Sequence, residues 1–210
     1  RWRPGGLARN GLGVLGWMLL RAAMQAATVV WLARQLGAQP YGQFVAVVAA
    51  SSFFTPFVGL GLSHMLLRNA ARDPAHAGNY LARALRWWLR TLLPCVAASV
   101  VVALWLLPER IALLALLVVA AAERSATSLT ELCARHVQAQ QRTHAFGAVN
   151  AGLPGARLVA LGLLWSGTRD AGVTAVLWTY AASGLIYAAL LWVPLRAAAK
   201  APDAVLPEPM

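Results

Sequence analysis

Apolar residues fill long stretches of the chain, and polar residues gather between them. A membrane-spanning helix needs about 20 mostly apolar residues, and six stretches reach that length. They lie near residues 11–33, 42–66, 87–107, 110–132, 146–166 and 173–195. The connections at 34–41, 108–109 and 167–172 are short, whereas those at 67–86 and 133–145 are longer and polar. The pattern predicts an all-α membrane protein, a bundle of six transmembrane helices over residues 1–198, followed by a Pro-rich tail at 199–210.

Proline and glycine interrupt three of these stretches. They are Pro56 with Gly59 and Gly61, Pro94, and the run NAGLPGARL around Pro154. Proline removes a backbone hydrogen bond from a helix and often kinks it. Each site is therefore predicted to bend or loosen its helix, and a kink is expected most clearly at 152–155.

Composition agrees with a lipid environment. Hydrophobic residues make up 60% of the 210 residues and charged residues 12%, with a mean hydropathy of +0.61, whereas soluble domains carry about 25% charged residues. A net charge of +11 would ordinarily point to nucleic acid. The arginines, however, lie at the ends of apolar runs and form no basic stripe between exposed aromatic residues. Nucleic acid is therefore not an expected partner.

The distribution of lysine and arginine predicts the orientation in the membrane. Of the 18 basic residues, twelve lie on one side of the six stretches and three on the other. The twelve are Arg1, Arg3, Arg9, Arg68, Arg72, Arg83, Arg86, Arg90, Arg135, Arg142, Arg196 and Lys200, and the three are Arg34, Arg110 and Arg169. Cytoplasmic loops are enriched in these residues, so both termini are predicted to face the cytoplasm.

The remaining three basic residues, Arg21, Arg124 and Arg157, lie inside apolar stretches. At a rise of about 1.5 Å per residue, each reaches the middle of a hydrocarbon layer about 30 Å thick, as does Glu123. An arginine at that depth costs about 2.5–3.5 kcal/mol on insertion scales. A single glutamate neutralises a single arginine, so a positive excess is expected there.

Two interpretations of these charges stay open. One is an internal salt bridge of Glu123 with Arg21 or Arg157 that fixes packing, or a fourth helix that leaves the membrane early at Glu123. The favoured one is a water-filled cationic cavity for an anionic substrate, because guanidinium groups bind phosphate oxygens in pairs. The fourth stretch supports the cavity, since Glu123, Thr127 and Thr130 share one helical face.

Enzymatic motifs are not found in the sequence. It has no Gly-rich phosphate loop, no nucleophile elbow and no pair of catalytic carboxylates. Cys95 and Cys133 lack the spacing of metal ligands, and no pair of the four histidines has a helical metal spacing. We therefore expect no enzymatic activity, no metal and no cofactor.

The stretch LARQLGAQPYGQF and the later PFVGLGLSHMLLR carry a family resemblance. Together they resemble the start of the oligosaccharide (O-antigen type) flippases of polysaccharide biosynthesis, in the superfamily of multidrug and oligosaccharidyl-lipid exporters. The matching residues are Arg34, Gly37, Tyr41, Gly42, Gly59, Gly61 and Arg68, together with Leu36 and Leu60. Gly37 and Gly42 are expected to allow special backbone angles between the first two helices.

The resemblance implies one lobe of a two-lobed, alternating-access transporter in a bacterial inner membrane. Its implied substrate is an undecaprenyl-diphosphate-linked oligosaccharide for surface lipopolysaccharide or exopolysaccharide. Arg21, Arg124 and Arg157 would then hold the diphosphate, and Glu123 would gate the site or couple an ion. The expected partners are membrane lipids, the lipid-linked oligosaccharide, and a missing C-terminal lobe or a second copy, with other polysaccharide assembly proteins a further expectation. The absent initial Met and the ending KAPDAVLPEPM suggest a piece of a longer protein.

Two other functions fit part of the pattern. A multidrug antiporter would share the superfamily, but its site for a cationic drug should be acidic and aromatic rather than lined with arginine. A non-transporting membrane scaffold of a polysaccharide assembly complex would need no substrate site. A membrane glycosyl-transfer enzyme would need acidic residues on a large outer loop, and the predicted outer loops are short.

Overall fold

The computed structural model describes residues 4–106, 113–168 and 171–200, and within them the chain is all-helical. Two 3-10 turns, η1 (Thr55–Phe57) and η2 (Pro74–His76), accompany the longer helices. Those helices are α1 (Pro4–Leu36), α2 (Ala38–Ser52), α3 (Leu62–Arg72), α4 (Ala77–Leu106), α5 (Leu113–Ala139), α6 (Thr143–Gly167) and α7 (Val173–Lys200). The all-α prediction is confirmed.

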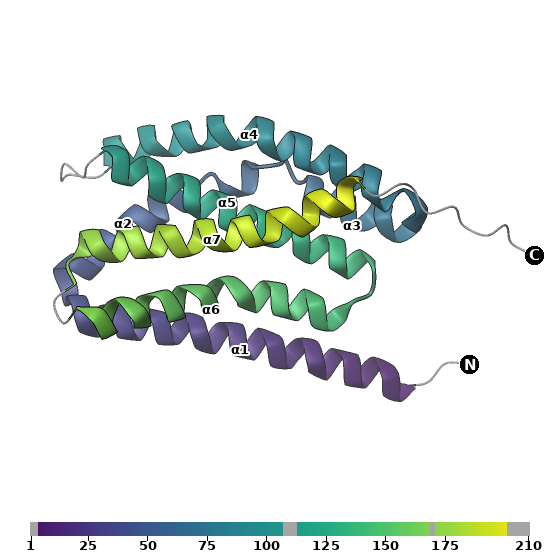
Figure 1. The fold of residues 1–210 in the computed structure, drawn as a ribbon, viewed down its shortest axis with the longest axis horizontal. Coiled ribbons are helices and arrows are strands. Elements are labelled where there is room, and N and C mark those ends of the chain that lie inside the picture. The colour runs from purple at the N-terminus through teal and green to yellow at the C-terminus, as the bar shows by residue number, and fades with distance from the viewer. Residues whose placement is uncertain (1–3, 107–112, 169–170, 201–210) are drawn as a thin grey trace, which may run out of the picture.

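The helices run up and down a single elongated bundle (Figure 1). The start of α1 and the end of α7 lie at one end of the bundle, here called the terminal end, and the α1–α2 and α6–α7 corners lie at the far end. Helix α5 is central and contacts α2, α3, α4, α6 and α7. Helix α1 lies at an edge, where it packs along α6 and touches α2 at the corner.

Several helices have the length and apolarity of membrane spans. Four pass that test, at Gly11–Leu36, Pro74–Trp105, Thr143–Gly167 and Val173–Lys200. A fifth would be the bent pair Ala38–Phe57 and Leu62–Arg72, whose halves meet at 44°. These long apolar helices are those of a membrane-spanning protein.

The bend between α2 and α3 lies where proline and glycine predicted one. Gly59, Leu60 and Gly61 all have positive φ, between 51° and 77°, a conformation that glycine adopts without a steric penalty. The backbone N–H of Gly59 donates to the hydroxyl of Thr91 on α4 at 2.8 Å, which satisfies a donor that the helix break leaves open. In contrast, Pro94 and Pro154 lie inside the continuous helices α4 and α6.

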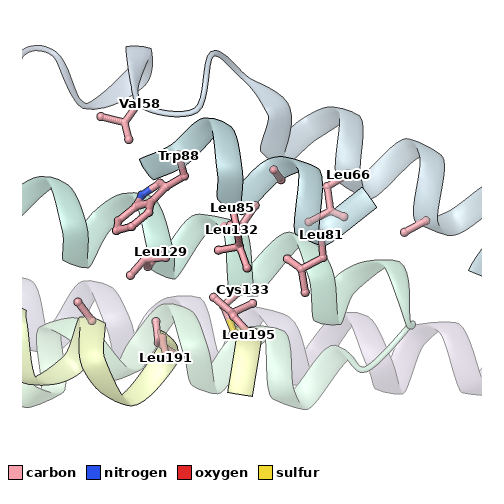
Figure 2. Close-up of a cluster of buried hydrophobic side chains, with 13 residues drawn as sticks. Val58, Leu66, Leu81, Leu85, Trp88, Leu129, Leu132, Cys133, Leu191 and Leu195 are labelled. Atoms are coloured by element: carbon pink, nitrogen blue, oxygen red, sulfur yellow. The ribbon is translucent and has the colours of Figure 1, made fainter. Parts of the chain in front are cut away.

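Apolar residues of the described chain form two large core clusters along the bundle and a small third one of Val96, Val100 and Ala120 between α4 and α5. The terminal-end cluster joins α3, the start of α4 and the ends of α5 and α7, with Leu81, Leu85 and Trp88 facing Leu129 and Leu132 (Figure 2). The far-end cluster joins α1, α2, α5, α6 and α7, and includes Leu32, Phe44, Val119, Leu161 and Val176. Between the two clusters lies a central polar layer, made of Glu123, Arg124, Ser128, Arg157 and Ser183, most of it buried.

Two segments predicted as polar connections are largely helical instead. Residues 67–72 belong to α3 and residues 77–86 to α4, while α5 continues to Ala139. The reason is amphipathicity, because Leu81, Ala84 and Leu85 face the core while arginines occupy the opposite face. Several predicted features lie outside the described residues. They are the connection at 108–109, Arg110, Arg169, the tail residues 201–210 and the side chains of Arg1, Arg3 and Arg9.

Candidate functional site

A cavity of about 770 Å³ opens between α1 and α2 on one side and α5, α6 and α7 on the other. It forms because α1 diverges from α2 beyond their shared corner and packs on α6 instead of on α5. Polar side chains line much of the central part of this cavity. They are Arg21, Gln25 and Thr28 from α1, Glu123, Thr127, Thr130, Glu131 and Arg135 from α5, and Asn150 and Arg157 from α6.

Arg157 and Glu123 form an ion pair in the cavity wall. The Arg157 Nη2 donates to Oε2 of Glu123 at 2.5 Å, and the two side chains are 12% and 7% exposed. The guanidinium also lies over the ring of Tyr180, with its carbon 4.0 Å from the ring centroid. Among the two alternatives drawn from the sequence, the internal salt bridge therefore exists, and it lies at the surface of a cavity.

Arg21 stands apart from that ion pair. It is exposed on α1, and its Nη1 donates to Oδ1 of Asn150 at 3.3 Å. No carboxylate of the described residues forms an ion pair with it. Arg21 also lines a second cavity of about 250 Å³, which adjoins the first at Glu131, Arg135 and Asn150. The free positive charge of the site therefore sits on α1.

Arg124 does not line either of these cavities. Its side chain is fully buried, and it points to the opposite side of α5, where Cys95 of α4 is a neighbour. Its Nη1 donates to the carbonyl of Ala120 at 3.2 Å, while Nε and Nη2 have no hydrogen-bond partner among the described residues. Arg124 is adjacent to Glu123 on α5, and adjacent helix positions project about 100° apart. Glu123 therefore faces the main cavity while Arg124 faces away from it, so the three mid-depth arginines do not converge.

A polar cluster closes the cavity wall toward the terminal end. Glu131 accepts a hydrogen bond from Ser63 at 3.0 Å, and its carboxylate lies 3.5 Å from His64 and 3.9 Å from Arg135. These contacts tie α3 to α5 across the end of the bundle. His136 lies on α5, just over one turn after Glu131. Burial lowers the pKa of His136, and the positive charge of Arg142 lowers it further.

The residues of the resemblance mostly shape the corners. Gly37 separates α1 from α2 with φ 77°, as expected, whereas Gly42 lies inside α2 at ordinary helical angles, so its expected backbone role is wrong. Tyr41 lines the cavity, and Arg34 is exposed in the last turn of α1. Gly59 and Gly61 form the break described above, and Arg68 is exposed on α3.

The lining of the main cavity carries both signs of charge, with a small positive excess. Three arginines (Arg21, Arg135 and Arg157) and two glutamates (Glu123 and Glu131) line the main cavity, so three minus two leaves a formal charge of +1. Within the described parts of the chain, no three His, Cys, Asp or Glu side chains come close enough to hold a metal ion. The lining donates hydrogen bonds and offers no activated nucleophile.

Three participants were not identified from the sequence. Arg135 falls in the predicted polar connection at 133–145, although it follows Glu131 by one helical turn on the face that carries Glu123 and Thr127. Asn150 precedes Arg157 by two turns on α6, which is a usable signal. Tyr180 lies in an apolar helix, where nothing in the sequence sets it apart from its neighbours.

No protein-family model, no curated protein and no solved structure matches this chain.

Proposed function

We propose that this chain is a membrane lobe of a transporter that moves a lipid-linked oligosaccharide across a bacterial cytoplasmic membrane. The proposed substrate carries its glycan on undecaprenyl diphosphate, and the diphosphate binds in the main cavity. The observation that carries the proposal is Arg21, an exposed guanidinium at mid-helix that lines the main cavity and has no carboxylate partner among the described residues. An uncompensated arginine at that depth is costly unless it faces water or an anion.

The two arginines of the cavity have different proposed roles. Arg21 is free to bind the first phosphate, because among the described residues only the neutral amide of Asn150 contacts its guanidinium. Arg157 is paired with Glu123, so an incoming phosphate competes with that carboxylate for the guanidinium. Release of Glu123 would let it take up a proton or a small cation, which is how we propose that the site is gated or coupled to an ion.

The proposed orientation has six passes, counting the bent pair α2–α3 as one, with both termini in the cytoplasm. It rests on the excess of lysine and arginine at the terminal end and on the up-and-down course of the helices. The main cavity lies between helices of this chain, and transporters that alternate access work with two halves. We therefore propose that a second lobe or a second copy completes the transport site.

A cationic drug is a weaker candidate for the same cavity, because the lining carries a formal excess of positive charge. No observation specifically favours a scaffold without a substrate.

Complementation tests the proposal directly. The chain is expressed in a flippase-deficient strain by itself, and then with a separately encoded second lobe, and surface glycan is measured. Rescue in either arrangement is the expected result, and rescue by the chain alone would identify a second copy as the partner. Failure of both arrangements at normal membrane levels would contradict the proposal.

Substitution of single arginines tests the site. Arg21→Gln should abolish rescue, because it removes the free charge of the cavity. Arg34→Gln is the matched control, since Arg34 is an exposed arginine of the same helix outside the cavity lining, and it should leave rescue intact. If Arg21→Gln and Arg157→Gln both leave rescue unchanged, the diphosphate does not bind here.

A further inference from the structure

Helix α4 lies at the opposite edge of the bundle from α1 (Figure 1). It carries a further pocket, which is basic. Its lining is Arg83, Arg86, Trp87 and Arg90, and its volume is about 210 Å³. We propose that this pocket binds the phosphate of an anionic phospholipid headgroup in the cytoplasmic leaflet. The proposal depends on membrane insertion and on the proposed orientation. It does not depend on transport, because no residue of α4 lines the main cavity.

The helical register gathers these four side chains on one exposed face. Arg86 and Trp87 lie three and four residues after Arg83, and four and three residues before Arg90, so all four share one side of the helix. The intervening Leu81, Ala84, Leu85 and Trp88 are buried in the terminal-end cluster. Packing of the opposite face therefore fixes the backbone positions from which the three arginines project.

The charges of the pocket are uncompensated. Among the described residues, neither Arg83 nor Arg86 forms a hydrogen bond or an ion pair, and Arg90 contacts the ring of Trp87 with its guanidinium carbon 5.4 Å from the centroid. The three described acidic residues, Asp73, Glu123 and Glu131, all bind other partners. Three exposed guanidinium groups on one face repel one another unless an anion lies between them.

The depth of the pocket matches the headgroup layer. A span that ends near Leu106 begins about 20 residues earlier, near Trp87, because about 20 residues cross a layer of about 30 Å. Tryptophan favours that boundary. Arg83 and Arg86 then lie among the headgroups. Arg90 lies one turn deeper, but helical side chains lean toward the N-terminus, and its position over Trp87 directs its charge outward.

A phospholipid phosphate suits this arrangement better than a soluble anion does. Its oxygens accept paired hydrogen bonds from guanidinium groups, and its acyl chains would lie along the apolar outer surface of α4, where Leu89 and Leu93 are exposed. A basic residue near an anionic membrane contributes enough free energy for about a fivefold gain in affinity. Three of them select an anionic lipid over a zwitterionic one.

Native mass spectrometry of the full chain in detergent measures this selectivity. Dioleoylphosphatidylglycerol and dioleoylphosphatidylcholine are titrated separately against the wild-type protein. The test variant combines Arg83→Gln, Arg86→Gln and Arg90→Gln. The matched control combines Arg142→Gln, Arg196→Gln and Lys200→Gln, which removes the same three charges from exposed positions near the same end of the bundle.

The expected result is that the test variant binds phosphatidylglycerol at least about tenfold more weakly than the wild type, while the control changes by less than about threefold. Phosphatidylcholine binding should be weak in all three proteins. Equal phosphatidylglycerol binding by the wild type and the test variant would overturn the proposal, and so would an equal loss in the control. Displacement of the lipid by millimolar inorganic phosphate would overturn the choice of a lipid as the ligand. If the triple variant aggregates, Arg83→Gln and Arg86→Gln are measured singly, each with an expected loss of about threefold to fivefold.

Discussion

Arg157 and Arg124 are two arginines in the same polar layer of one small bundle, and their surroundings differ in almost every respect. Arg157 pairs with Glu123, covers the ring of Tyr180 and borders a cavity. Arg124 is wholly buried between α5 and α4 with two of its nitrogens unpaired among the described residues. Depth in the membrane thus does not determine the surroundings of an arginine, and the face of the helix decides which arginine borders the cavity.

The comparison also separates two costs of burial. A buried ion pair is costly to break, because the remaining charge is left without a partner. A buried charge that has no partner already destabilises the folded protein. Its removal should therefore lower the free energy of unfolding very little, or raise it. Four substitutions test this difference, in order of the effect expected.

Glu123→Gln should have the largest effect. It leaves Arg157 buried without its carboxylate, and the expected loss in the free energy of unfolding is about 3–5 kcal/mol. Titration with sodium dodecyl sulfate in mixed micelles measures this loss. The double variant Glu123→Leu with Arg157→Met is the control and should recover most of the stability. An equal loss in the single and double variants would show that the pair contributes no specific interaction.

Gly152→Ala should come next, because close packing of α6 on α7 positions Arg157. A Cβ at Gly152 would lie 2.3 Å from the hydroxyl of Tyr187, which donates to the carbonyl of Val149 at 2.7 Å. Overpacking of this kind costs about 1–3 kcal/mol. Gly155→Ala is the matched control on the same helix, since its Cβ would meet only the flexible end of Met24 at 3.4 Å. Equal thermal unfolding temperatures for the two variants would contradict the role of Gly152.

Tyr180→Leu should have a moderate effect on the Arg157 side. It removes the ring beneath the guanidinium, and a partly desolvated cation–π contact contributes about 0.5–2 kcal/mol. Tyr180→Phe keeps the ring and should retain most of the stability, so the two variants together isolate the contact. The same unfolding titration distinguishes them. A larger loss for Tyr180→Phe than for Tyr180→Leu would assign the contribution to the hydroxyl instead.

Arg124→Met should have the smallest effect, with stability unchanged within about 1 kcal/mol or raised, because an apolar side chain of similar length replaces an unpaired buried charge. Rescue in the complementation assay should also persist. Trp88→Phe is a useful comparison on the same side of α5, since it removes the buried hydrogen bond from Nε1 of Trp88 to Ser128 at 2.7 Å and should cost about 1 kcal/mol. A loss above about 2 kcal/mol for Arg124→Met would show that its charge is needed.

The helices were predictable where apolar length alone determines them. The first, fifth and sixth predicted stretches lie within α1, α6 and α7, and the break near Gly59 and Gly61 was expected from residues that favour unusual angles. The early start of α4 was missed because a length criterion for lipid ignores amphipathic turns outside it. There, Leu81 and Leu85 drive helix formation by packing on the core rather than by contact with lipid.

Several residues of the site were predictable from the sequence, but their arrangement in space was not. Mid-depth charge pointed to Arg21, Glu123 and Arg157, and the structure brings these three to one cavity. Arg124 had the same depth and the same residue type, so hydrophobicity could not separate it from the others. Only the packing of α4 against α5 assigns it to the opposite face. Asn150 and Tyr180 enter the site through the approach of α6 and α7, which no local pattern encodes.

The peripheral position of α1 has a consequence for how the protein is made. Its main packing partner is α6, and the contact between Arg21 and Asn150 joins residues 129 positions apart. Ribosomes add about 5–20 residues per second, so α1 waits on the order of ten seconds in the membrane before its neighbour is synthesised. Before then the corner with α2 is a further contact open to α1, and no residue of its most apolar segment is buried even in the finished bundle. We therefore expect nascent α1 to rely on the insertion machinery or on lipid headgroups to solvate Arg21 until α6 is synthesised.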